Sequence, residues 1–550
     1  MGKALKITIS TLLLSVLLLN RALPALAQGE TALDRATDNP YLSYYNPALM
    51  KPDARVISAD VCVYGGTSAG VIAAVQLKKM GKSAVILEPG GHLGGLSSGG
   101  LSFTDIGNKK AIGGLSHDFY KRLGQKYGKP EEWRFEPHVA EQVFNELIAE
   151  SATPVYRYQF VRSVRKENGR ITQIRTVSGL TVRADVFIDA TYEGDLMALA
   201  GVAYRIGRES NATYSETLNG VQQRDKHQFE FAIDPYTVAG DPNSGLLPGV
   251  WAEENTTTGQ GDNSIQAYNF RLCLSSDPAN QTPFPRPRHY DPRQYEMLAR
   301  YLNAGWNKIF GGFGILVNKK VDLNNNGAIS SDFIGMNRDY PVATYRQRER
   351  IFQEHLAYQQ GWLYFLATDP QVPPAVRAQV VKWGLARDEW PETDNWPAQL
   401  YIREARRMVG AYVMTEANVR ATQTADDAIG LAAYTMDSHN TRRFVRDGRL
   451  WNEGDVQVGG FPPYPISYRA IVPQKSQCRN LLVPVCLSTS HIAYGSIRME
   501  PVFMILGQSA ATAAALAIDG GYDIQDVPYA DLKARLIQDE QVLAWVKEAK

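Results

Sequence analysis

The stretch Val61–Gly70, which reads VCVYGGTSAG, decides the fold of this chain. Its first four residues form a short apolar pattern that is typical of a buried strand. The other six predict a tight turn: Gly65, Gly66, Thr67, Ser68, Ala69 and Gly70. Apolar residues then recur at helical spacing over 71–80, and Gly81 is placed to end that helix. Because 83–87 is a second apolar run, the stretch predicts a strand–helix–strand unit of about 30 residues.

The predicted turn has most features of a dinucleotide-binding fingerprint, which places glycines at positions one, three and six. Gly65 and Gly70 fit positions one and six, whereas Thr67 occupies position three. A helix that begins at such a turn offers backbone N–H groups and a partial positive charge to phosphate. Glu88 ends the second strand, where a carboxylate can accept hydrogen bonds from a ribose. The order of these features favours a nucleotide site over a glycine turn without a ligand.

The residues after Glu88 distinguish between two nucleotide cofactors, which the turn alone does not separate. Residues 90–100 read GGHLGGLSSGG. Backbone so rich in glycine can lie against a large planar cofactor and its phosphates, and a nicotinamide-binding domain does not need it. A soluble nicotinamide cofactor would also be diluted outside the cytoplasm, whereas a tightly held flavin would stay. We therefore expect FAD.

The first 27 residues have the pattern of a secretory signal peptide. Lys3 and Lys6 precede an apolar run over 7–19, and Ala25-Leu26-Ala27 supplies small residues at a cleavage site. A membrane anchor is the alternative, but the run is short for a span of ~20 residues. We expect cleavage near Ala27, a periplasmic or secreted location and no stable membrane anchor afterwards. No pair of arginines precedes the apolar run, so we expect export of the unfolded chain. Either the flavin is then loaded after export, or the expectation of a flavin is wrong.

Length and charge limit the other function classes. The chain has 550 residues, and single cores stop growing at ~250–300 residues, so more than one domain is expected. Lys and Arg number 58 against 57 Asp and Glu. This balance predicts no nucleic-acid partner, because binding to phosphates usually needs a basic excess.

The pattern of elements predicts a nucleotide-binding domain built from both ends of the chain. Runs at 155–164, 171–177 and 180–188 alternate like strands, with hairpin turns between them. Helices are expected at 292–303, 341–367, 398–418 and 501–518, and a strand at 480–483. The expected organisation is a signal peptide (1–27), a surface segment (28–58), the N-terminal portion of the FAD-binding domain (59–204), a substrate or cap domain (205–450) and the C-terminal portion of the FAD-binding domain (451–550).

Three separated blocks of this sequence resemble bacterial FAD-dependent oxidoreductases of the FAD_oxidored type. The matching residues are the Gly65–Gly70 turn with its continuation at His92–Gly95, Gly99–Leu101 and Asp105, then 189–196, and then 488–491, 496–501 and 507–510. The resemblance implies an α/β fold: a glutathione-reductase-like FAD-binding domain, with a Rossmann-type βαβ unit and a β-meander, plus an inserted mixed α+β substrate or cap domain. It also implies redox chemistry. Besides the turn and Glu88, it implies cofactor contacts at Pro89, Gly94, Gly95, Leu96, Asp189, Ala190, Thr191, Gly194, Asp195, Gly507 and Gln508.

Candidate catalytic residues are the polar side chains expected near the flavin. His439 lies where the chain returns from the middle segment, and His491 and Arg498 precede the last long helix. Histidine is suited to accept a proton near neutral pH while a substrate is oxidised. Arg498 could hold a substrate anion or the charge of the reduced flavin. Each of the three could instead be a structural hydrogen-bonding residue.

Several weaker signals leave alternatives open. Cys478 and Cys486 could pair in an oxidising compartment, and His92 could be joined covalently to the flavin. Residues 322–332 resemble the start of a calcium loop but lack its closing acid, so no metal is predicted. Arg403 and Arg407 could share one helix face, either ion-paired or, with the nearby tryptophans at 383, 390 and 396, lining a sugar or carboxylate pocket.

These features together predict an exported dehydrogenase or oxidase. Its substrate would be small and polar, and the aromatic-rich middle segment suggests a saccharide. The electron acceptor is left open. Two alternatives remain from other classes: a polysaccharide- or surface-binding protein on a flavoprotein fold, and a non-redox lyase with structural FAD.

Overall fold

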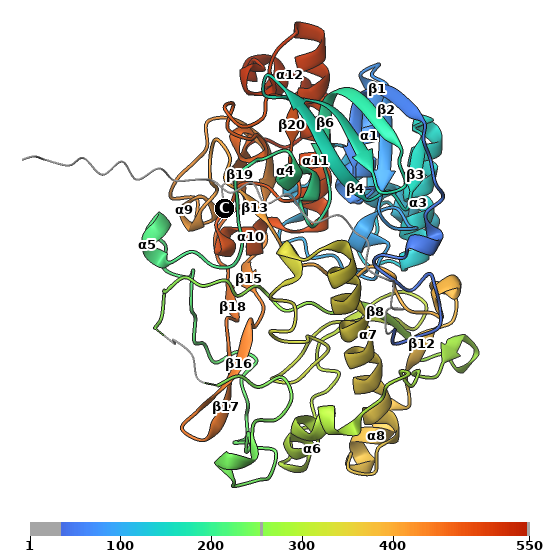
Figure 1. Cartoon of the computed structure of the whole chain (residues 1–550), viewed down its shortest axis with the longest axis vertical. Coiled ribbons are helices and arrows are strands. Elements are labelled where there is room, and N and C mark those ends of the chain that lie inside the picture. Colours follow the sequence, from blue (N-terminus) through green and yellow to red (C-terminus); the bar gives the residue numbers. More distant parts are fainter. Residues whose placement is uncertain (1–34, 253–256, 547–550) are drawn as a thin grey trace, which may run out of the picture. The chain divides into compact units, whose positions relative to one another are not determined.

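A computed structural model describes residues 35–252 and 257–546. The predicted strand–helix–strand unit is confirmed as the centre of a seven-stranded sheet (Figure 1). Strand β1 pairs in parallel with β2 on one side and with β6 on the other, and β3 and β20 extend the parallel region. These strands are β1 (Val56–Tyr64), β2 (Ala84–Glu88), β3 (Val155–Arg157), β6 (Thr181–Asp189) and β20 (Leu481–Leu482).

Strands β4 (Val161–Glu167) and β5 (Arg170–Thr176) form the predicted meander with β6, in antiparallel pairing. The prediction of one strand over 155–164 was wrong. Tyr158 has a φ of 58°, which breaks the extended backbone. Residues before it pair with β2 as β3, and residues after it begin β4.

Two long-range partners complete this region of the fold. Helix α1 (Ser68–Lys79) packs against α11 (Glu500–Gly520), so residues more than 400 positions apart build one layer beside the sheet (Figure 1). Their contact is close because a Cβ at Gly507 would overlap the carbonyl oxygen of Ala69. Among the described residues α11 is the one helix long and apolar enough to cross a membrane, but 89% of its most apolar window is buried inside the protein. Such burial is typical of a core helix.

The middle of the chain forms a second, five-stranded sheet (Figure 1). The longest helix of the same part of the chain is α7 (Tyr345–Thr368). A full capping box at Thr344 and Gln347 fixes the start of α7. The strands, in spatial order, are β10 (Phe313–Ile315), β11 (Lys320–Leu323), β8 (Leu272–Ser275), β12 (Gly384–Ala386) and β9 (Gln281–Thr282). The nearby helices are α6 (Glu296–Asn303) and α8 (Pro374–Val380).

Other strands of the described residues form pairs outside these two sheets. Four two-stranded pairs are β7 (Tyr204–Arg205) with β13 (Arg407–Met408), β14 (Ala428–Ala432) with β19 (Tyr464–Ser467), β15 (Met436–Ser438) with β18 (Val456–Val458), and β16 (Arg442–Arg446) with β17 (Arg449–Glu453). The other α-helices of the described residues are α2 (Gly114–Lys126), α3 (Pro137–Ser151), α4 (Asp195–Leu199), α5 (Asn211–Tyr214), α9 (Glu416–Val419), α10 (His491–Ile497) and α12 (Tyr529–Gln538).

The predicted helix over 398–418 was wrong. The segment is largely irregular, with the two-residue β13 in its middle and only the short α9 at its end. Arg403 and Arg407 do not share an exposed helix face, because both side chains are fully buried. Each guanidinium has a buried carboxylate partner: Arg403 pairs with Asp332 and Arg407 with Glu209. These distant ion pairs, rather than the local helical spacing, determine the backbone here.

The four cysteines are free and buried, so the alternative of a Cys478–Cys486 disulfide was wrong. The described residues form one compact unit, which contains both sheets. The domain boundaries at 204 and 450 stay a prediction. The expected signal peptide at 1–27 lies outside the described residues.

Candidate flavin site

The glycine turn joins β1 to α1 with its backbone tightly packed. Gly65 has a φ of 102°, which favours glycine, and its N–H donates to the carbonyl of Leu87 on β2. A Cβ at Gly70 would overlap the carbonyl oxygen of Gly65. Position one therefore needs glycine for its backbone conformation, and position six needs it because a side chain would not fit.

Thr67, at position three, has a structural role that explains the departure from glycine. Its hydroxyl donates to the carbonyl of Ala190 at 2.7 Å and accepts from the N–H of Gly70 as the N-cap of α1. The side chain thus connects the turn to the end of β6.

Glu88 lies at the carboxyl end of β2, beside the turn. Its two carboxylate oxygens accept from the backbone N–H groups of Gly66 and Gly90. Burial raises the pKa of Glu88, and these two N–H donors act in the opposite direction. The carboxylate is therefore held at the strand end, where a ribose hydroxyl can reach it.

A cavity of about 470 Å³ opens between the turn, the end of β2 and the middle of the chain. Six of the predicted cofactor residues line it: Gly65, Thr67, Glu88, Pro89, Gly95 and Thr191. These six residues come from three separate segments: the first turn, the stretch from Glu88 through the glycine-rich segment, and the end of β6. Glycines on the cavity wall allow a large planar ligand to lie directly against the backbone. The residues present therefore fit the FAD that the sequence predicts.

The other predicted cofactor residues lie outside the lining of this cavity. Asp195 is bound by Arg348 and Arg406, and Gln508 accepts from the N–H of Leu115 at the start of α2. Asp189 accepts from the N–H groups of Thr191 and Met197, so it shapes the loop after β6. The full set is Gly66, Ser68, Ala69, Gly70, Gly94, Leu96, Asp189, Ala190, Gly194, Asp195, Gly507 and Gln508.

The sequence did not predict much of the remaining lining. Tyr41, Ser43 and Tyr44 belong to the segment expected to wrap the surface, yet they cover the cavity. Side chains on α7 hold this segment, because Glu349 accepts from the N–H of Tyr45 and Gln353 donates to the carbonyl of Leu42. The other unpredicted lining residues include Arg157, Phe160, Tyr192, Glu193, Trp390, Gln399 and Leu400.

His92 lines the cavity with both ring nitrogens facing carboxylates. Its Nδ1 lies 3.0 Å from Glu141 and its Nε2 lies 3.3 Å from Glu392. This ion-paired arrangement favours a structural role at the rim, and the covalent flavin link stays an alternative without support from these contacts.

The three catalytic candidates meet around β15. Arg498 donates to the carboxylate of Asp437 at 3.1 Å, and His439 Nε2 lies 3.5 Å from the same carboxylate. His491 Nε2 is hydrogen-bonded to Ser438 at 3.0 Å, while its Nδ1 contacts Glu404 at 2.8 Å. All three candidates are buried. The structure therefore brings together residues from positions 437–439 and 491–498. None of them lines the cavity of the turn, so their expected position near the flavin stays a prediction.

Three buried arginines surround Tyr401 next to this group. The guanidinium carbons of Arg403, Arg498 and Arg271 lie 4.5, 5.7 and 5.9 Å from the ring centroid. Arg498 also donates to the hydroxyl of Tyr401 at 2.7 Å. We call Arg271, Tyr401, Arg403, Asp437, His439 and Arg498 the buried polar cluster.

The two acids of the calcium-like stretch have partners in or beside this cluster. Asp322 accepts from Arg271, and Asp332 binds both Arg403 and His439. Neither carboxylate is directed into the Asn-rich loop as a calcium ligand.

The glycine-rich segment separates the cavity from the buried polar cluster. A Cβ at Gly99 would lie 2.6 Å from the Cβ of Gln399, and one at Gly100 would overlap the carbonyl oxygen of Arg271. Gly99, Gln399 and Leu400 line the cavity, and Tyr401 follows directly in the chain. The cluster therefore lies immediately behind the inner wall of the cavity.

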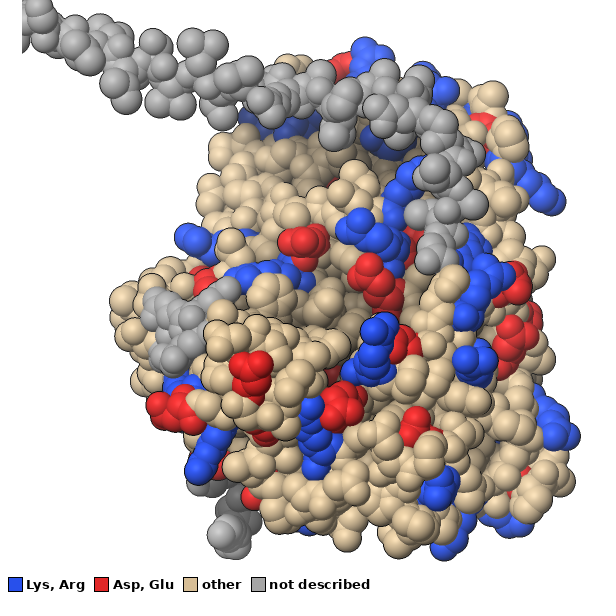
Figure 2. Space-filling model, turned by 60° about the horizontal axis from the view of Figure 1, so that its bottom comes forward, with Lys and Arg blue, Asp and Glu red and all other residues tan. Residues whose placement is uncertain are grey.

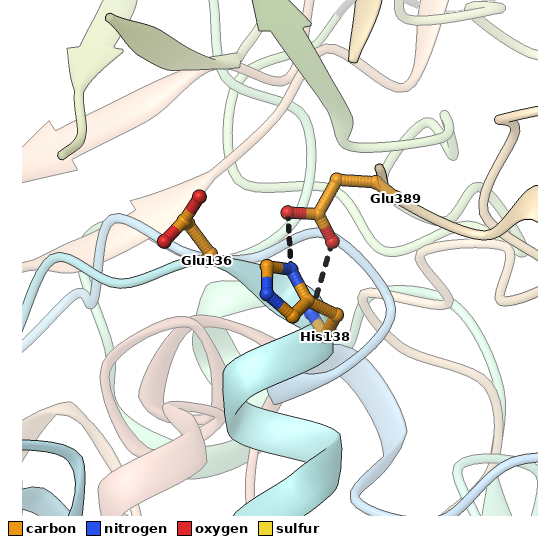
Figure 3. Close-up of side chains that lie close together, drawn as sticks. All are labelled: Glu136, His138 and Glu389. Carbon is orange, nitrogen blue, oxygen red and sulfur yellow. Dashed lines mark hydrogen bonds and ion pairs between the residues drawn. The ribbon is translucent and has the colours of Figure 1, made fainter. Parts of the chain in front are cut away.

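One acidic group resembles a metal site but already holds a cation. Glu136, His138 and Glu389 bring their ligand atoms together at the start of α3 (Figure 3). The buried ammonium of Lys320 lies 2.6 Å from Glu136 and 2.8 Å from both Asp388 and Glu389. This lysine neutralises the carboxylates where a metal ion would otherwise do so.

Surface charge is mixed on the face that Figure 2 shows. Lysine and arginine side chains alternate there with aspartate and glutamate, and no broad basic area is seen among the described residues of this face.

Replacing Glu88 by alanine is expected to lower FAD affinity by roughly 10- to 100-fold, since hydrogen bonds to a charged group contribute about 1.5–3 kcal/mol. Titration of the apoprotein with FAD, followed by quenching of flavin fluorescence, measures the change. Glu167→Ala at the exposed end of β4 is the control and should bind FAD as the parent does. Equal affinities of the two variants would contradict this role of Glu88.

Comparisons with known proteins indicate the family of this chain. Similar solved structures are an L-proline dehydrogenase from P. horikoshii (17% identity, TM-score 0.23, 28% of this chain and 59% of that chain) and an L-amino acid deaminase from Proteus vulgaris (16% identity, TM-score 0.23, 29% and 54%). The chain thus spans little more than half the length of either protein, and we draw no substrate from them. No curated protein sequence matches significantly. The model of the family described as FAD dependent oxidoreductase matches residues 60–536. The chain belongs to this family of FAD-dependent oxidoreductases, and FAD is its cofactor.

Proposed function

We propose that this oxidoreductase is an exported dehydrogenase or oxidase that oxidises a small polar substrate, with a neutral polyhydroxyl compound such as a carbohydrate as the preferred class. The observation that carries the proposal is the buried polar cluster behind the inner wall of the cavity. Its arginines are balanced by Asp322, Asp332 and Asp437. A site with both donors and acceptors and little net charge suits hydroxyl groups, because each hydroxyl donates and accepts.

Unpaired polar atoms in this region support a polar ligand. The Nε atoms of Arg403 and Arg498 and the Oδ1 of Asn440 are buried without a hydrogen-bond partner among the described residues. Such atoms are costly in an apolar interior. A hydroxylated substrate would supply partners for both donors and acceptor.

Aromatic residues give less support to a carbohydrate than the sequence suggested. Trp396 is buried and packs against Phe270, and Trp383 packs against Phe313. Trp390 alone of the three lines the cavity, and its indole N–H donates to the carbonyl of Ser98. The proposal therefore depends on the polar cluster rather than on a tryptophan platform.

The proposed roles follow from the contacts of the cluster. When bound, FAD supplies the hydride acceptor. His439 is the proposed base that accepts the substrate hydroxyl proton at Nε2, because Asp332 orients its Nδ1 at 2.8 Å. Nε2 lies 3.5 Å from Asp437, so the substrate hydroxyl would have to approach it beside that carboxylate. Arg498, held by Asp437 and Tyr401, would bind the substrate oxygen from which that proton leaves.

An anaerobic screen tests the redox proposal. The purified protein should be yellow, and sugars, hydroxy acids and amines are added without oxygen while the flavin absorbance is followed. A substrate that bleaches the flavin supports the proposal, and readmission of air then separates an oxidase from a dehydrogenase. Product formation without bleaching would instead indicate a lyase with structural FAD.

Export is tested separately. The apolar run and the Ala25-Leu26-Ala27 sequence support cleavage by a signal peptidase. The N-terminal residue of the secreted or periplasmic protein should be Gln28. Retention of residues 1–27 in a membrane fraction would contradict the proposal and favour an anchor.

A further inference from the structure

Glu500 is a buried carboxyl at the first position of α11, and three hydroxyl groups bind it. Ser68 donates to its Oε2 at 2.5 Å, Tyr192 donates to its Oε1 at 2.7 Å, and Ser97 lies 3.3 Å from Oε2. Its residue is only 3% exposed. One side chain therefore joins the start of α1, the glycine-rich segment and the loop after β6, which are far apart in the sequence.

Tyr192 connects Glu500 to the wall of the cavity. Its hydroxyl accepts from the N–H of Leu96 at 2.8 Å while it donates to Glu500. A Cβ at Gly95 would overlap that hydroxyl, so the glycine backbone lies directly on it. Tyr192 and Gly95 both line the cavity, whereas Glu500 does not. The position of this wall thus depends on a residue behind it.

The surroundings of Glu500 leave it without an opposite charge. Burial raises its pKa to about 7, and the hydroxyls of Ser68, Tyr192 and Ser97 only reduce that rise. The titratable groups that face it are Tyr192 and, on α2, Tyr120. No cation is among the groups that shift its pKa in the described residues. A change of protonation near neutral pH therefore alters the hydrogen bonds of all three segments.

We propose that Glu500 is a positioning residue for the flavin cavity, which acts through Tyr192, and that its neutral form is the one that binds FAD. The pyrophosphate of FAD carries negative charge, and Ser68 at the start of α1 belongs to the turn that would receive it. A second negative charge nearby favours the protonated carboxyl. FAD binding would then be accompanied by uptake of a proton at Glu500. This inference concerns the cofactor and does not depend on the identity of the substrate.

The pH dependence of FAD binding tests the proposal. By linkage, uptake of a proton means that affinity is highest below the pKa of Glu500 in the apoprotein and falls as pH rises through it. We expect the affinity of the parent apoprotein to fall by about tenfold between about pH 6 and pH 8, beyond the change seen in Glu500→Gln. Other groups in the cavity, such as His92, Glu88 and Glu193, titrate in both proteins and do not enter this difference. Parallel pH profiles would overturn the proposal.

A control variant shows whether the change in pH profile is specific to Glu500 or follows the loss of any buried carboxylate. Asp427 is buried, accepts from the hydroxyl of Ser467 and lies outside the cavity lining. Asp427→Asn should keep the pH profile of the parent. A profile as flat as that of Glu500→Gln would show that the effect is not specific to Glu500, and would overturn the proposal.

Tyr192→Phe tests whether Glu500 acts through the tyrosine, and decides the case if Glu500→Gln does not fold. The variant should lose FAD affinity by about tenfold and lower the melting temperature of the apoprotein, because removal of the hydroxyl leaves the Leu96 N–H and Glu500 without this partner. Combined with Glu500→Gln, it should cost less than the sum of the single losses. Unchanged FAD affinity in Tyr192→Phe, or fully additive losses, would overturn the proposal.

Discussion

Gly70→Val is expected to yield a protein that no longer retains FAD. A Cβ at position 70 would overlap the carbonyl oxygen of Gly65 and lie 3.3 Å from Val63, so the clash is with backbone and cannot be relieved by a side-chain rotation. Either α1 moves away from β1, or Gly65 is displaced from its left-handed conformation. Overpacking of this kind costs about 1–3 kcal/mol or more, and the cost falls on the turn that forms the cavity wall. If this cost falls fully on binding, FAD affinity should fall by roughly 5- to 150-fold or more.

Gly81→Ala provides the matched control at the other end of α1. Gly81 has a φ of 72°, but a Cβ there would meet nothing within 4 Å. The substitution should cost about 1 kcal/mol of stability through backbone strain alone and leave FAD binding intact. The two variants are compared by flavin absorbance after gel filtration and by thermal unfolding of the apoproteins. A Gly70→Val protein that stays yellow would show that the turn does not form the cofactor site.

Local sequence was sufficient to predict the nucleotide-binding half of the fold. The strand, turn, helix, strand and acid follow one another within 61–88, so their order in sequence is also their order in space. Thr67 shows how far that local reasoning extends. Its departure from glycine weakened the motif, but its partner is Ala190, more than 120 residues away, and no local pattern indicates that hydrogen bond.

Residues whose conformation depends on distant charges could not be predicted in the same way. The helical spacing of Arg403 and Arg407 was outweighed by buried pairs with Asp332 and Glu209. A buried ion pair is costly to break, so such pairs override a weak helical preference.

Much of the cavity lining could not be predicted from the sequence for a similar reason. Tyr41 and Tyr44 belong to a polar stretch that gives no signal of burial, and their position depends on Glu349 and Gln353 on α7. Glu500 was recognised only within a resembling block, because its three partners are spread over 68–192. The sequence thus predicted which cofactor binds, whereas the residues behind the cavity wall required the structure.

His439→Gln is expected to slow substrate-dependent reduction of the flavin by roughly 100- to 10,000-fold while FAD stays bound. Glutamine can still form hydrogen bonds in the place of the imidazole but cannot accept a proton. FAD content should not change, because His439 does not line the cofactor cavity. Anaerobic stopped-flow measurement of flavin bleaching, with the substrate found in the screen, gives the rate. His117→Gln is the control, since His117 on α2 forms the same kind of pair with the carboxylate of Glu131. Unchanged reduction in His439→Gln would remove this residue from the mechanism and leave His491 to be tested next.

The pH profile of the same rate separates a base from a structural histidine. Burial and the guanidinium of Arg403 act to lower the pKa of His439, but the carboxylates of Asp332 and Asp437 outweigh them and raise it above its ordinary value of 6.5. A base must be neutral before it accepts a proton, so the reduction rate should rise with pH through this raised pKa. Asp437→Asn removes one of the carboxylates that favour the charged imidazole, and the rising limb should therefore move to lower pH. A limb that stays in place in Asp437→Asn would indicate that another group supplies the base, because a carboxylate 3.5 Å away favours the charged imidazole of His439.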